Sequence, residues 1–174
     1  GRVFLLVDGG QVGGADAMRH GSQIGIAGNA AAELDLAFGA FADFADNEAL
    51  LVALMRKVMH LKMAYWEVAL REAGDNVDAV NEADDFAGQF SMLISPKMYR
   101  RIVKPLHKEL FDFIHARTKA KLFFHSCGAI RPVIGDLIEI GVDILNPIQV
   151  SAAGMDTAEL KREFGKDITF WGGG

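Results

Sequence analysis

The sequence predicts an α/β fold built on parallel strands, and three observations support this. Short apolar runs without polar alternation recur along the chain, as in strands that are covered on both faces. From residue 77 onward, helical patterns alternate with these runs. Such alternation implies parallel strands joined by right-handed crossovers. An open doubly wound sheet and a (β/α)₈ barrel both fit this order.

The predicted strands are rich in Val, Ile, Leu and Phe. They cover Val3–Val7, Val77–Asn81, Lys121–Phe124, Val142–Leu145 and Ile168–Phe170. Gly9-Gly10 and Gly13-Gly14 follow the first run, but their spacing is not that of a dinucleotide-binding fingerprint. This glycine loop can bring backbone close to a ligand or can be a simple connection.

The longest predicted helix covers residues 48–73, with Asp46 or Asn47 as its N-cap. Its apolar residues recur at steps of three and four, the spacing of one helix face. That face carries Leu51, Leu54, Val58, Leu61, Tyr65 and Val68.

A second predicted helix begins at Ser95-Pro96 and continues to about Arg117. Pro105 lies inside it and is expected to kink or split it, because proline removes a backbone donor. A third helix is predicted over residues 131–140. A fourth begins at Asp156, which forms a capping box with Glu159, and ends at Gly165.

Composition limits the class of protein. The 174 residues are 51% hydrophobic, which suits one domain around one core. A net charge of −5 and the absence of a long basic tract argue against a nucleic-acid partner. One cysteine and no leader segment predict a cytoplasmic setting, and no apolar run is long enough to cross a membrane. Strand-like runs lie close to both ends, so we expect parts of the fold to lie beyond them.

Polar and metal-ligating residues gather where the predicted strands end, which is where parallel α/β folds bind ligands. These residues are Asp8, Glu82, Asp84, Asp85, His125, Cys127, Asn146, Gln149 and Trp171. His125 and Cys127 give the sharpest signal, because side chains at i and i+2 of a strand face the same side. Imidazole and thiolate are good zinc ligands. His107 and His115 fall on a helical pattern and are predicted to be surface or boundary residues.

Structural alternatives exist for each candidate. A cysteine is often a small core hydrophobe. Asp84-Asp85 can form a turn or cap a helix, and Asn146-Pro147 is typical of a turn.

Six motifs, in order from about Asp43 to the end, resemble those of the uroporphyrinogen decarboxylase superfamily. They are residues 82–85 (EADD), 94–99 (ISPKMY), 105–107 (PLH), 124–128 (FHSCG), 141–147 (GVDILNP) and 170–174 (FWGGG). The resemblance implies that residues 1–174 form one partial (β/α)₈ TIM-barrel domain, with N- and C-terminal parts of the barrel missing.

One branch of that superfamily contains methyltransferases that hold zinc through a His-x-Cys motif and a distant second cysteine. By resemblance, His125 and Cys127 are the zinc ligands, and the third ligand lies beyond Gly174. The resemblance further implies a small-molecule methyl donor or acceptor, and a corrinoid that is either the substrate or is carried by a partner protein. Glu82, Asp84 and Asp85 are then candidate catalytic carboxylates, and the candidate substrate contacts are Asn146, Gln149 and Trp171.

Two alternatives stay open. The other main branch removes carboxyl groups from uroporphyrinogen in tetrapyrrole (heme) biosynthesis without a metal, using arginines and an aspartate near its N-terminus. A non-catalytic homologue that binds a tetrapyrrole is the third possibility.

Overall fold

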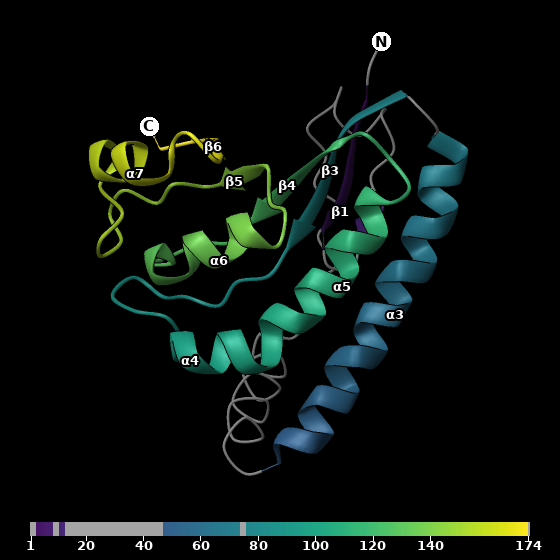
Figure 1. The fold of residues 1–174 in the computed structure, drawn as a ribbon, viewed down its shortest axis with the longest axis horizontal. Coiled ribbons are helices and arrows are strands. Elements are labelled where there is room, and N and C mark those ends of the chain that lie inside the picture. Colours follow the sequence, from purple (N-terminus) through teal and green to yellow (C-terminus); the bar gives the residue numbers. More distant parts are fainter. Residues whose placement is uncertain (1–2, 9–10, 13–46, 74–75, 174) are drawn as a thin grey trace.

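The computed structural model describes residues 3–8, 11–12, 47–73 and 76–173. Its sheet has the strand order β2-β1-β3-β4-β5-β6, in which all neighbours run parallel except β2 and β1 (Figure 1). The strands are β1 (Val3–Asp8), β2 (Gln11–Val12), β3 (Val77–Ala83), β4 (Lys121–His125), β5 (Ile144–Asn146) and β6 (Thr169–Phe170). The predicted α/β fold with parallel strands, part of a TIM-barrel-like sheet, is therefore confirmed. Only β2 was not predicted.

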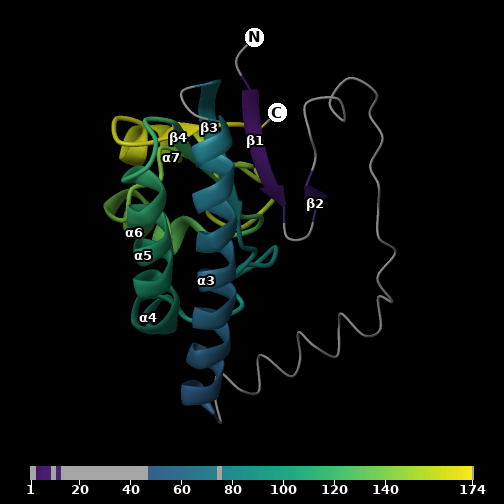
Figure 2. The ribbon, with the colours of Figure 1, turned by 90° about the vertical axis from the view of Figure 1, so that its right-hand side faces the viewer.

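The helices follow the strands in the alternation that the sequence predicts. They are α3 (Glu48–Ala73), α4 (Pro96–Met98), α5 (Lys104–His115), α6 (Ile134–Glu139) and α7 (Thr157–Phe164), with a π-helical turn η2 (Tyr99–Val103) and a 3₁₀ turn η3 (Arg131–Val133). Helices α3 and α5 lie side by side (Figures 1 and 2). Helix α7 lies near β6 (Figure 1).

The register of the sheet decides which side chains meet. Glu82 pairs with Phe124, and Ala83 pairs with His125 on the neighbouring strand. Phe124 is completely buried in the core that the helices cover. Because successive side chains of a strand point to opposite faces, His125 faces the other side of the sheet, the side that becomes the interior in a closed barrel.

Helix α3 has the predicted bounds, but the predicted apolar face is not the one that packs most deeply. Asn47 caps the helix through a hydrogen bond from Leu50 N to its Oδ1, 3.2 Å long. The side chains buried against the body are Leu51, Met59, Trp66 and Leu70. Four of the predicted face are exposed: Leu54, Val58, Leu61 and Val68. Two apolar stripes run side by side on this helix, and spacing alone does not tell which one meets the sheet.

The segment after Ser95 is split as Pro105 predicts. The hydroxyl of Ser95 accepts a hydrogen bond from Met98 N, 3.1 Å long, and starts α4. The π turn η2 follows, and α5 begins at Lys104 with Pro105 in its first turn. Lys104 N donates to the carbonyl of Tyr99 in the π-helical pattern, and Pro105, which lacks an N–H, cannot continue that pattern, so the helix changes type at this point.

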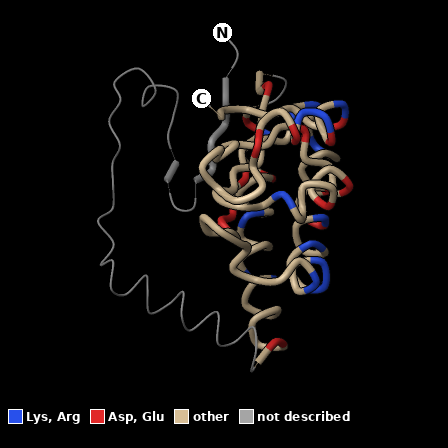
Figure 3. Tube along the Cα trace, turned by 90° about the vertical axis from the view of Figure 1, so that its left-hand side faces the viewer, with Lys and Arg blue, Asp and Glu red and all other residues tan. Residues whose placement is uncertain are grey.

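Charged residues of both signs are interspersed along the described chain (Figure 3). An ion pair from Arg56 to Glu109, at 2.9 Å, joins α3 to α5, and a second, from Arg117 to Glu67 at 2.6 Å, joins α3 to the residues just after α5. Within the described residues, no helix combines the length and apolar character that a membrane span requires.

Candidate metal centre

Three metal-ligating side chains converge beyond the ends of β3 and β4. One ligand atom from each of Asp85, His125 and Cys127 lies within 4.8 Å of the other two. The thiol Sγ of Cys127 is 3.5 Å from Nε2 of His125. Carboxylate oxygen, imidazole nitrogen and thiolate sulfur are all ligands that zinc accepts. The structure thus brings together the predicted pair and adds a carboxylate to it.

The hydrogen bonds around His125 direct the lone pair of its Nε2 toward Cys127, where a metal could be bound. Asn146 Nδ2 donates to the carbonyl of Trp171 at 3.0 Å, so Asn146 Oδ1 faces the imidazole as an acceptor. It lies 2.8 Å from Nδ1 of His125. Nδ1 must therefore carry the proton, and Nε2, on the side of Cys127, keeps its lone pair. Such an outer partner fixes the tautomer of a metal-ligating histidine in many metal sites.

Cys127 lies in surroundings that keep its thiol protonated. Burial raises the pKa of Cys127, and the negative charge of Asp85 raises it further. The same carboxylate accepts a hydrogen bond from the backbone N–H of Cys127, 2.7 Å long. A divalent cation at this point would offset both effects, because metal coordination deprotonates a thiol.

Gly128 makes the loop around Cys127 possible. Its φ is +86°, and a Cβ at this position would lie 2.5 Å from the carbonyl oxygen of Ala87. Its N–H donates to Gln149 Oε1 at 2.9 Å, and Gln149 in turn donates to Gln89. Gln149 was predicted to contact substrate; in the structure its side chain supports the loop that carries Cys127.

Glu82 and Asp84 point away from this centre. Glu82 is buried among the helices, where it accepts hydrogen bonds from Lys62, at 2.8 Å, and from Trp66. Asp84 lies 3.0 Å from Nε2 of His107 on α5. Of the three predicted catalytic carboxylates, only Asp85 is at the metal centre.

The prediction that His107 is a surface or boundary residue is wrong, because its ring is buried. One edge of α5 faces the core, and helical periodicity places His107 with Leu106, Leu110 and Phe111 on that edge. His115, at the end of the same helix, is partly exposed as predicted.

Aromatic side chains flank the metal centre on one side. Phe123 precedes His125 by two residues and therefore shares its face of β4. Its ring meets Trp171 edge to face at a centroid distance of 6.0 Å. Strand alternation would have identified Phe123 beside the predicted apolar wall Trp171.

Asp8 ends β1, but its side chain and the glycine loop lie outside the described part of the chain.

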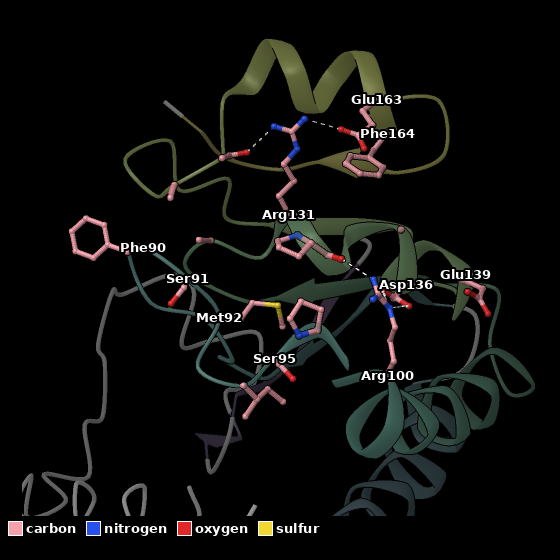
Figure 4. Close-up of a pocket in the computed structure, with 17 residues that line it drawn as sticks. Phe90, Ser91, Met92, Ser95, Arg100, Arg131, Asp136, Glu139, Glu163 and Phe164 are labelled. Carbon is pink, nitrogen blue, oxygen red and sulfur yellow. Dashed lines mark hydrogen bonds and ion pairs between the residues drawn. The ribbon is translucent and has the colours of Figure 1, made fainter. Parts of the chain in front are cut away.

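A cleft of about 810 Å³ lies elsewhere, between the loop before α4 and helices α6 and α7. Its arginines already have acidic partners. Arg131 forms ion pairs with Glu159 and Glu163, and Arg100 forms one with Asp136. Figure 4 shows the pairs with Glu163 and Asp136. A ligand there would have to displace these ion pairs. The cleft therefore offers no set of converging free polar groups comparable to the metal centre.

Comparison with known proteins identifies the family. A family model described as uroporphyrinogen decarboxylase (URO-D) matches residues 37–172. The chain belongs to the uroporphyrinogen decarboxylase family. No curated protein and no solved structure matches it. The URO-D match covers every residue of the metal centre and the strands from β3 to β6, and it confirms the resemblance seen in the motifs.

Members of this family are largely enzymes, so URO-D membership supports an enzymatic role without naming the reaction. A decarboxylase and a methyltransferase both remain compatible with it.

Proposed function

We propose that this URO-D family protein is a zinc-dependent methyltransferase that moves a methyl group to or from a corrinoid. The observation that carries the proposal is the convergence of Asp85, His125 and Cys127 within 4.8 Å. A converging carboxylate, imidazole and thiol are the donor types that zinc prefers, which is why we favour the metal-dependent reaction.

The donor set fits zinc. Sulfur, imidazole nitrogen and one carboxylate make three protein ligands, and a catalytic zinc site keeps a fourth position open for substrate. When bound, zinc supplies a Lewis acid and a means of keeping a thiol deprotonated near neutral pH. The resemblance implies that the third protein ligand lies beyond Gly174, and this stays a prediction; such a ligand would take the position that Asp85 has in this proposal.

The surrounding residues have separate tasks in this proposal. Asn146 holds the His125 ring with Nε2 directed at the metal position. Gln149 holds the Cys127 loop through Gly128 N. Phe123 and Trp171 supply an apolar wall, which keeps water from one side of the site and suits a methyl group. The methyl donor or acceptor and a corrinoid protein are the proposed partners.

Zinc content is the first test. The protein, Cys127→Ala and His125→Ala would be dialysed and their zinc counted by elemental analysis, with His60→Ala as the control for loss of a histidine outside the centre. We expect close to one zinc per chain in the parent and the control, and little in the two centre variants. Methyl transfer between methylcobalamin and a thiol, followed by the absorbance of the corrinoid, then tests the reaction.

Absence of zinc from the parent would reject this proposal. The decarboxylase named by the family then becomes the leading candidate, and its assay is the loss of carboxyl groups from uroporphyrinogen in the presence of a chelator. Zinc in the parent with no methyl transfer would reject the reaction but keep the metal site.

A further inference from the structure

His107 is enclosed by aromatic rings at the junction of α5 with the sheet. Its ring is stacked on Phe111 at 5.4 Å and meets Phe124 edge to face at 5.4 Å. Phe86 and Tyr99 complete the enclosure at 6.2 and 5.9 Å. A polar ring in such surroundings is stable only if both of its nitrogens have partners.

Both nitrogens of His107 do have partners. Tyr99 Oη lies 3.4 Å from Nδ1, and Asp84 Oδ2 lies 3.0 Å from Nε2. Burial raises the pKa of Tyr99, so its hydroxyl keeps its proton and can donate it to Nδ1. A neutral His107 then carries its own proton on Nε2 and donates it to Asp84.

Asp84 and Asp85 are consecutive, and their side chains are held in opposite directions. The backbone N–H of Asp84 donates to the carbonyl of His125 at 3.1 Å. The Asp84 carboxylate reaches back to His107, while the Asp85 carboxylate reaches forward to Cys127 N at 2.7 Å. These contacts hold the dipeptide from both sides, together with a longer ion pair from Lys62 to Asp84 at 3.8 Å.

We propose that His107 is a positioning residue for the metal centre: by holding Asp84 against α5, it aims the Asp85 carboxylate at the gap between His125 and Cys127. This inference rests on the proposed metal site. The same Asp84 oxygen also forms a longer ion pair with Lys62 of α3, whose Nζ lies 3.8 Å away and is bonded to Glu82 at 2.8 Å. Without His107, Asp84 would be held, among the described residues, by Lys62 alone. Asp84 would turn toward it and carry the following peptide, with Asp85, out of place.

The test compares His107→Phe and His107→Gln with the parent, and uses His115→Gln as the matched control on the same helix. Phenylalanine suits the aromatic enclosure but cannot bond Asp84. The amide nitrogen of glutamine can replace Nε2 as the donor. Zinc affinity is measured by competition with a chromophoric chelator, ligand geometry by the visible absorption of the Co²⁺-loaded protein, and folding by urea unfolding.

We expect His107→Phe to lower zinc affinity by up to about tenfold and to change the Co²⁺ spectrum, the lower end of the effect for residues that bond a ligand directly, because His107 acts on Asp85 through Asp84. His107→Gln should recover part of the affinity and the parent spectrum, and His115→Gln should match the parent. If His107→Phe does not fold, Asp84→Ala removes the same contact from the other side and decides: a changed Co²⁺ spectrum with lower zinc affinity supports the proposal, and a parent-like affinity and spectrum in the folded variant contradict it.

Two further outcomes are distinguishable. If the parent binds metal and His107→Phe keeps both affinity and spectrum, this inference is wrong and the metal site stands. If the parent binds neither zinc nor Co²⁺, the proposed function fails and this inference fails with it.

Discussion

Replacing Gly128 by alanine tests whether the loop that carries Cys127 is as tightly determined as its geometry indicates. Gly128 has φ +86°, and an added Cβ would meet the carbonyl oxygens of Ala87 at 2.5 Å and Gly88 at 2.6 Å. Both contacts are with backbone, so no flexible side chain can move aside. The loop must shift, and the left-handed backbone conformation is also unfavourable for alanine.

The expected loss of stability follows from three contributions. A positive φ at a residue with a Cβ costs about 1–2 kcal/mol. The shift breaks or weakens two hydrogen bonds, from Gly128 N to Gln149 Oε1 and from Ala129 N to the carbonyl of Gly88, each worth about 1 kcal/mol. We therefore expect Gly128→Ala to lower the free energy of unfolding by about 3–4 kcal/mol.

Urea unfolding followed by circular dichroism measures this loss. With a slope of about 2 kcal/mol per M, the midpoint should fall by roughly 1.5–2 M. Gly88→Ala is the matched control, because its Cβ would have no neighbour closer than 3.8 Å and its φ is not in the left-handed region. Its midpoint should stay within about 0.3 M of the parent. Equal midpoints for Gly128→Ala and the parent would refute this account of the loop.

Three more predictions follow from single groups. Glu82→Gln leaves Lys62 without its buried partner and should cost about 2–3 kcal/mol in urea unfolding, whereas a surface glutamate, Glu72→Gln, should cost almost nothing. In metal-free protein, burial and the charge of Asp85 raise the pKa of Cys127, so alkylation of its thiol by iodoacetamide should be slow at neutral pH and faster in alkali. Asp85→Asn should make this alkylation faster at pH 8. Saturating zinc should suppress it. Burial alone would raise the pKa of Asp143, but hydrogen bonds from Lys121 and Leu122 N hold this pKa below its ordinary value. The ionised Asp143 therefore stabilises the fold above about pH 4, and this contribution is lost as the pH falls through the lowered pKa. The acid loss of stability should accordingly be shallower in Asp143→Asn, and an unchanged slope would contradict that assignment.

Strand and helix positions follow well from local sequence because they depend on periodicity and caps. Ser95 and Asp156 were identified as caps, and Asn47 as one of two candidates; each accepts a backbone hydrogen bond at the start of its helix. Pro105 split its helix because proline cannot continue one without losing a bond. The apolar face of α3 was predicted less well, since the choice between two adjacent stripes depends on what packs against them.

His125 and Cys127 were identified together because both follow directly from one strand, and strand alternation brings i and i+2 to one side. Sequence reasoning did not separate the roles of Glu82, Asp84 and Asp85, three carboxylates within four residues. In the structure, Glu82 and Asp84 contact side chains of the helices, and of the three only Asp85 lies at the candidate metal centre.

Sequence by itself therefore determined the family, the parallel α/β order and the strand end at which metal chemistry can occur. Those features are encoded in short stretches whose residues act locally. Only the tertiary structure decided that Asp85 joins His125 and Cys127, that Asn146 sets the imidazole tautomer and that His107 lies buried beside Asp84. Each of these depends on the register between strands or on the docking of α5, and such contacts join residues far apart in the chain whose relative positions no local pattern records.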